Sequence, residues 1–257
     1  MGGFRRLTHR VWLRIETESE NSQMSEILVH KHTRREFRNR MLSGELKACI
    51  IPVAAIEQHL EHMAMEHDWR SVNVIAEGVA SRLAPHVVVA QGVMAGISEH
   101  HMKHIGTLSL TPATFMAVLG DLIDSMVRAG FTNILVLNGH GGNIAPCNGV
   151  WDQYLRQFQI NLQFLPYWDV LTDEDAKLLQ SQSIPGHAQE FETAFALAEF
   201  PENVRIADVS DQPDPEPAMA TEENGRVLIE RTIDRVSQFL QEMIDGSNVA
   251  KIPAFFE

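Results

Sequence analysis

Acidic and imidazole side chains crowd residues 57–68, whose sequence is EQHLEHMAMEHD. Glu57 and His59 directly follow the apolar run ACIIPVAAI, and residues two apart in an extended backbone point to the same side. Both side chains could therefore face one metal ion, and Asp68 follows within the reach of a short loop that folds back. The competing interpretation of this segment is a solvated polar loop that leaves a strand.

A second candidate site is the turn NGHGGN, residues 138–143. Its glycines allow positive φ angles and close approach of the backbone, and they leave His140 as the side chain that can act as a ligand or base. A plain strand-to-helix turn is one alternative, and a phosphate-binding loop is another. The segment matches neither G-x-G-x-x-G nor a P-loop, and no lysine follows it.

The segment GHAQEFETAF supplies three more candidates, His187, Glu190 and Glu192. A helix that begins near Ala188 would put the two glutamates on different faces, since residues two apart on a helix do not face the same way. We therefore expect only one of these carboxylates to reach a site, and the pattern leaves open which one.

Histidines also gather in SEHHMKH, residues 98–104. His100 and His104 are four apart, which suits a zinc pair on a helix, but no apolar periodicity supports a helix there and HEXXH is absent. Metal binding is therefore the least favoured interpretation of this tract, behind a plain polar loop and a loop that contacts substrate. Trp168 lies at the end of an expected strand, where packing in the core or at the rim is favoured over a substrate wall.

The elements that must position these residues can be located from apolar runs and helix caps. Strands are expected at ACIIPV, HVVVA, NILVLN and NLQFLPYW, with a further extended segment at TLSL. Helices are expected at residues 33–44, 68–84, 112–129, 145–158, 189–200 and 222–245. The clearest helix has Thr111 as its N-cap, proline at its first position and Gly130 as its stop.

Strands that alternate with helices predict an α/β fold with a mostly parallel sheet and helices on both faces. Ligands bind such sheets outside the carboxyl ends of the strands. The motifs at 57–68 and 138–143 each follow an apolar strand, so we expect them to meet at one rim of the sheet.

Composition bounds the class of protein. The chain has 257 residues, 44% hydrophobic and 21% charged, and its formal net charge of −13 disfavours nucleic-acid partners. Two cysteines far apart in apolar segments predict reduced, buried thiols. Apolar runs are too short to span a membrane, and no signal-peptide pattern opens the chain, so a cytoplasmic location is expected. We expect an N-terminal extension at residues 1–32 and a single domain at residues 33–257.

The motifs IPVAAIEQHLEHMAMEHD, GTLSLTP, GFTNILVLNGHGGN and GHAQEFET together resemble the creatininase (creatinine amidohydrolase) family over residues 33–200. The resemblance implies a three-layer α/β sandwich with a mostly parallel central sheet and a hydrolytic site with two divalent metal ions, Zn²⁺, Mn²⁺ or Fe²⁺. It implies that Glu57 and His59 bind different ions, that Asp68 bridges them, and that His140 completes the shell of the first ion.

The same resemblance implies roles for the remaining candidates. Glu192 matches a family glutamate and is the expected last ligand of the second ion, with Glu190 as the alternative. His187 matches the histidine assigned to proton transfer, and Ser98 matches a serine that contacts substrate. Trp168 is our further candidate for substrate binding.

This sequence departs from the family pattern at two places. Gly141 and Gly142 stand where creatininase itself has a tyrosine and a glutamate ligand. Ser183 stands where the family has a tryptophan, four residues before the catalytic histidine, in the wall around creatinine. These departures argue against creatinine as the substrate.

The ligand set predicts hydrolysis. Carboxylate and imidazole ligands suit zinc, manganese or iron(II), and two ions about 3.5–4 Å apart can share a hydroxide. We expect cleavage of a non-peptide C–N bond in a small amide or cyclic amide, with His187 protonating the leaving nitrogen. The alternatives are a hydrolase of a cyclitol-like ring, a peptide-maturation protease of the same family and, from another class, a metal-binding scaffold without activity. The expected partners are a small-molecule substrate and, from the resemblance, further copies of the chain, often as a hexamer.

Overall fold

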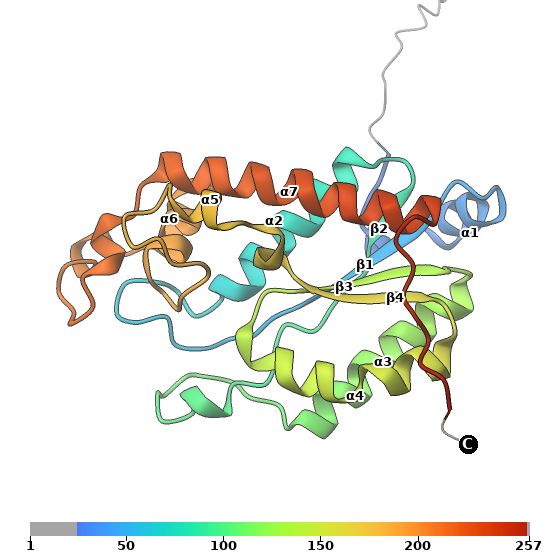
Figure 1. Ribbon diagram of the computed structural model, residues 1–257, viewed down its shortest axis with the longest axis horizontal. Helices are drawn as coiled ribbons and strands as arrows, with labels where there is room; N and C mark the ends of the chain where they lie inside the picture. The colour runs from blue at the N-terminus through green and yellow to red at the C-terminus, as the bar shows by residue number, and fades with distance from the viewer. Residues whose placement is uncertain (1–24, 256–257) are drawn as a thin grey trace, which may run out of the picture.

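The computed structural model describes residues 25–255 and contains a four-stranded parallel sheet (Figure 1). The strand order is β2 (Val87–Val89), β1 (Ala48–Val53), β3 (Asn133–Asn138) and β4 (Asn161–Pro166). Each strand runs parallel to its neighbours, and the last residue of β1 lies opposite the last residue of β3. The chain therefore leaves both central strands at the same edge of the sheet.

Helices cover both faces of this sheet, which gives three layers. One face packs against α2 (His67–Arg82), α6 (Glu190–Glu199) and α7 (Glu222–Asp245), and the other against α3 (Pro112–Ala129) and α4 (Ile144–Phe158). Alternate strand residues supply the two cores: Ile50 and Leu135 face the first group of helices, whereas Ile51 and Val136 face the second. The expected three-layer α/β architecture is confirmed.

Local capping accounts for where the helices begin and end. The Thr111 side chain accepts the backbone N–H of Thr114 at the start of α3, and Gly130 ends that helix at a φ of 110°. At α1 (Arg34–Leu42), Thr33 and Glu36 form a reciprocal capping box. These caps are the signals that the sequence pattern predicted.

Two expected strands differ in the structure. The TLSL segment forms no strand, because its pairing is limited to an isolated antiparallel bridge between Ile56 and Leu108. The strand expected for NLQFLPYW ends at Pro166, and the chain then turns into the 3-10 helix η4 (Tyr167–Val170).

Short helices complete the connections between these elements: η1 (Val29–Lys31), η2 (Glu99–His101), η3 (Gly141–Asn143), α5 (Asp173–Ala176), η5 (Pro201–Asn203), η6 (Ile206–Asp208) and η7 (Glu216–Met219). Most of the expected extension, residues 1–24, lies outside the described residues. Leu28 forms a parallel bridge to Val89, so the described part of that segment packs at the β2 edge of the sheet.

Two further expectations concern the membrane and the thiols. Within residues 25–255, no helix has the length and apolar character needed to cross a bilayer. Cys49 and Cys147 are both free and buried, and both belong to the core beneath α3 and α4. Burial raises the pKa of each thiol to about 12.

Candidate metal centre

The candidate site lies where β1 and β3 end, which is the rim that the strand pattern predicted. Glu57 and His59 follow β1, and His140 follows β3. Asp68 and Glu192 lie in the first turns of α2 and α6. A helix N-terminus carries a partial positive charge, which favours a carboxylate in its first turn. All five side chains are buried, with exposed fractions of 5% or less.

Asp68 lies between the two histidines. Its Oδ2 is 2.9 Å from Nδ1 of His140, and its Oδ1 is 3.0 Å from Nε2 of His59. Glu57 Oε1 lies 3.4 Å from Nδ1 of His140, and Glu192 Oε2 lies 3.8 Å from Nε2 of His59. The five candidate ligands therefore form two groups that share Asp68, as a bridging carboxylate would require.

The backbone orients both imidazoles toward these carboxylates. Nε2 of His140 lies 3.0 Å from the carbonyl oxygen of Ile97, and Nδ1 of His59 lies 3.0 Å from the carbonyl oxygen of Glu57. When a carbonyl holds one ring nitrogen, the other nitrogen can present its lone pair to an ion. The Ser98 hydroxyl donates to Oε2 of Glu57 and orients that carboxylate as well.

The buried histidines and carboxylates of the site shift one another's pKa values. Burial disfavours the charged form of each group, but the neighbouring carboxylates outweigh it and raise the pKa of His59 to about 9 and that of His140 to about 10. The same contacts hold the pKa of Asp68 well below its usual range. Burial raises the pKa of Glu192 to about 8, since His59 only partly offsets it.

The donor set fits divalent cations. Within residues 25–255, the ion-pair partners of Glu57, Asp68 and Glu192 are all histidines, and no lysine or arginine neutralises them. Oδ2 of Asp68 is buried, and Nδ1 of His140 lies beside it at 2.9 Å. Divalent ions can replace the protons that such ligands carry.

A second cluster lines the mouth of the site. His187 is about a third exposed, and its Nδ1 lies 3.5 Å from Oε1 of Glu57. The side-chain amide of Gln58 donates to Nε2 of His187 at 2.7 Å and to Nδ1 of His101 at 2.9 Å. The rings of His187 and His101 stack with centroids 4.4 Å apart. Burial, with a further contribution from His59, lowers the pKa of His187 to about 4, so this ring is neutral near pH 7.

A pocket of about 290 Å³ opens onto these groups, with Glu57, Asp68, His140 and Glu192 among its lining residues. Trp168 forms part of its wall although the side chain is only 8% exposed. Such a volume lies at the small end of ligand pockets, which are about 300–1,000 Å³.

A family model described as Creatininase, creatinine amidohydrolase, matches residues 30–238. The chain belongs to the creatininase family. Creatinine amidohydrolase of Pseudomonas putida is 28% identical over 203 residues, 73% of this chain and 77% of the relative. 3-Dehydro-scyllo-inosose hydrolase of Thermotoga maritima is 28% identical over 178 residues, 66% of this chain and 55% of the relative. Mycofactocin precursor peptide peptidase of Mycolicibacterium smegmatis is 31% identical over 110 residues, 41% of this chain and 44% of the relative.

Solved structures share the fold. A crystal structure of creatinine amidohydrolase (creatininase) has a TM-score of 0.75 and 26% identity, covering 84% of this chain and 98% of the other. A structure described as "Creatininase Mn" also has a TM-score of 0.75, at 24% identity, covering 86% of this chain and 99% of the other. Members of the creatininase family are hydrolases, and this chain is therefore a hydrolase.

The structure distinguishes Glu190 from Glu192, whereas the sequence pattern left open which of the two reaches the site. The Glu190 carboxylate accepts the backbone N–H groups of Gln180 at 2.9 Å and Ser181 at 2.7 Å, so it faces a loop. Glu192 lines the pocket and also accepts the N–H of Ala188 at 2.5 Å. The geometry therefore favours Glu192 as the ligand.

Ser98 lies behind Glu57 and is fully buried, and it is not among the residues that line the pocket. The expected contact of Ser98 with substrate stays a prediction. Sequence reasoning also missed Gln58, although it stands inside the quoted EQH motif, because an amide side chain carries no charge signal. His101 belonged to a tract in which no pattern distinguished one histidine from the next.

Proposed function

We propose that this creatininase-family hydrolase is a metal-dependent amidohydrolase that cleaves a non-peptide C–N bond of a small amide or cyclic amide. The observation that supports it most is the convergence of three buried carboxylates and the imidazole of His140 on one small pocket, with Asp68 between His140 and the buried ring of His59. In this proposal Glu57 and His140 would hold one divalent ion, His59 and Glu192 would hold the other, and Asp68 would serve both. Zinc, manganese and iron(II) all suit these oxygen and nitrogen donors.

Divalent ions held there would lower the pKa of water and polarise the oxygen of the scissile carbonyl. The chain's own residues supply the proton transfer. An amide nitrogen only donates, so the contact from Gln58 leaves the proton of neutral His187 on Nδ1, the atom that faces Glu57 at the pocket floor. Nδ1 is therefore the atom at which we expect His187 to exchange a proton with the reacting groups.

The size and wall of the pocket bear on the substrate. A volume of about 290 Å³ favours a small molecule over a peptide, for which we would expect a longer cleft. Ser183 in place of the tryptophan of the creatinine wall argues against creatinine itself. The peptidase alternative is therefore disfavoured, whereas a cyclitol-like substrate, such as the one named for the Thermotoga maritima relative, remains a second candidate.

We also retain a homo-oligomer, such as a hexamer, and a cytoplasmic location as proposals. Light scattering of the purified chain tests the oligomeric state.

Metal analysis combined with a substrate screen tests this function. The purified chain should contain two divalent ions and hydrolyse one class among cyclic amides, formamides and cyclitol derivatives. Replacement of Asp68 by alanine should remove both ions and all activity, because it is the carboxylate shared by the two ligand groups. His187→Ala should keep both ions and lose about 10²–10⁴ in kcat. An active, metal-loaded Asp68→Ala protein would contradict the proposed site.

A further inference from the structure

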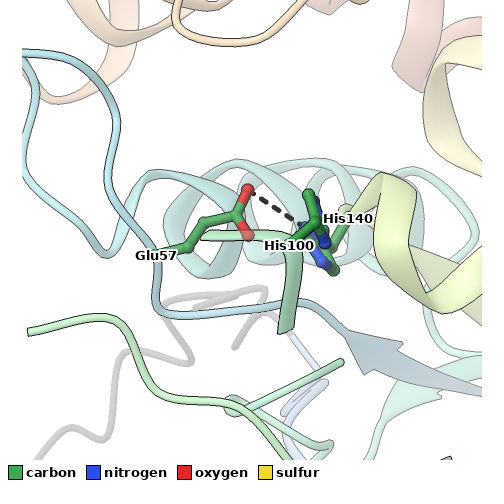
Figure 2. A group of neighbouring side chains, drawn as sticks. All are labelled: Glu57, His100 and His140. Carbon is green, nitrogen blue, oxygen red and sulfur yellow. Dashed lines mark ion pairs between the residues drawn. The ribbon is translucent and has the colours of Figure 1, made fainter. Parts of the chain in front are cut away.

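The side chain of His100 enters the candidate site from a loop that carried no helical pattern. The 3-10 helix η2 (Glu99–His101) directs it to the pocket wall beside Gly141 and Gly142. Its ring stacks on that of His140, with centroids 5.8 Å apart and planes inclined by 17°. Figure 2 shows the two imidazoles side by side, facing the carboxylate of Glu57.

We propose that His100 is an additional ligand of the ion held by Glu57 and His140, an assignment that rests on the proposed metal-dependent function. One donor atom from each of these three residues lies within 4.8 Å of the other two. Donors on one zinc ion, each about 2.1 Å from the metal, are at most about 4 Å apart. The His100 side chain is exposed, so its ring has room to rotate toward the other two donors.

The neighbouring turn leaves no room for a side chain at position 142, next to the ring of His100. A Cβ added at Gly142 would lie 2.1 Å from the carbonyl oxygen of Ile97, 2.5 Å from Nε2 of His140 and 3.0 Å from Cε1 of His100. The first two distances are shorter than real Cβ contacts, so position 142 cannot supply a ligand side chain with this backbone. His100 brings an imidazole to the same side of the pocket without that collision.

The neighbouring histidines have other contacts, although Nε2 of His101 also lies 3.8 Å from Oε1 of Glu57. Nδ1 of His101 accepts a hydrogen bond from Gln58, and the His101 ring stacks on that of His187. His101 therefore belongs with Gln58 and His187 in the cluster at the mouth of the site. Within residues 25–255, neither nitrogen of His100 has a hydrogen-bond partner of this kind, so its lone pair is available. His67 also lies near ligands, within 4.8 Å of donors on His59 and Glu192. It does not line the pocket, however, and packs edge-on against aromatic rings in the core.

Cobalt(II) titration of the full chain after removal of metal by a chelator tests this assignment. His100→Phe keeps a ring that can stack on His140 but removes the donor nitrogens. We expect this variant to bind one ion at least about tenfold more weakly than the wild type, with the other affinity unchanged. The visible absorption of the bound cobalt should also change, because one imidazole leaves its coordination shell. Circular dichroism should show the same fold, since His100 is exposed.

His104→Ala is the matched control, because it removes a histidine from the same exposed loop without touching the three-donor group. It should bind cobalt as the wild type does. Affinities within twofold for His100→Phe and the wild type would overturn the role of His100 and leave the proposed function intact, as would an equal loss in His104→Ala. A wild-type chain that takes up no ion would overturn both proposals. The comparison of His100→Phe with the wild type tests the role of His100 in either case, both if the wild type binds one ion and if it binds two.

Discussion

The first turn of α6 assigns opposite tasks to two carboxylates that are two residues apart. Glu190 accepts two backbone N–H groups of residues 180 and 181, whereas Glu192 faces His59 across the site. Both side chains are buried, so burial alone does not distinguish a ligand from a structural anchor. The hydrogen bonds do, because both oxygens of Glu190 accept backbone N–H groups, whereas Glu192 accepts one such group, from Ala188, through Oε2.

Isosteric amides should separate these tasks. Glu192→Gln should weaken metal binding by at least about tenfold, while the metal-free protein should be no less stable, because the pKa of Glu192 of about 8 marks a carboxylate whose ionisation burial disfavours. Glu190→Gln should bind metal normally and lose about 1–3 kcal/mol of unfolding free energy, because its amide group has one acceptor for two N–H donors. Isothermal titration and urea unfolding measure the two effects. The reverse pattern would make Glu190 the ligand.

At the scale of elements, Asp175 connects the short helix α5 to α7. Its carboxylate accepts hydrogen bonds from Arg231, at 2.8 Å, and from Arg235, and it also caps its own helix at Thr172. The side chain is almost fully buried, whereas both arginines are partly exposed. Burial would raise the pKa of Asp175, but Arg235, Thr172 and Arg231 outweigh it and hold that pKa well below its usual range.

A lowered carboxyl pKa contributes stability that is present above the pKa of the unfolded chain, about 3.9, and is lost as the pH falls toward the folded value. Asp175→Asn should therefore lower the free energy of unfolding by about 2 kcal/mol at pH 7. This loss is smaller than for a fully buried ion pair, because solvent screens the arginines. At pH 3 the loss should be clearly smaller than at pH 7. Urea unfolding at both pH values measures the difference from the wild type. Asp173→Asn, at an exposed position of the same helix, is the control and should change little at either pH. A cost for Asp175→Asn that is equal at the two pH values would exclude the ion pairs as its cause.

The elements themselves were largely predictable because their signals are local. Thr111 and Gly130 bound α3 through contacts within a few residues, and continuous apolar runs mark β1 and β3. The TLSL segment is not a strand because its one bridge pairs Leu108 with Ile56, which lies beyond the end of β1. That difference depends on tertiary contacts that no local pattern encodes.

The same distinction divides the candidate site. Glu57, His59 and His140 could be placed at one rim because the parallel register brings the ends of β1 and β3 together. The choice between the two glutamates of α6 could not be made, because it depends on a loop about ten residues earlier in the chain. The approach of His100 was also not predictable, because it depends on how an irregular loop folds over Gly142.

For the whole molecule, the proposed ligands come from segments as far apart in the chain as residues 57 and 192, so the two proposed ions together would join the sheet edge to α2 and α6. Ligands that bind only the folded state add about 2.7 kcal/mol when present at 100 times their Kd. For a domain of this size, that corresponds to a rise in Tm of about 5–10 °C. Differential scanning calorimetry with manganese and with a chelator should show this rise. Asp68→Ala should unfold at one temperature under both conditions, and a wild-type Tm that ignores the chelator would contradict ion binding by the folded chain.

Both cysteines lie on the side of the sheet opposite α7, so thiol chemistry reports on that side of the molecule alone. With pKa values near 12 and no exposed surface, neither sulfur can react with an alkylating reagent until that side loosens. The rate at which such a reagent labels the native chain therefore reports how often the structure beneath α3 and α4 opens.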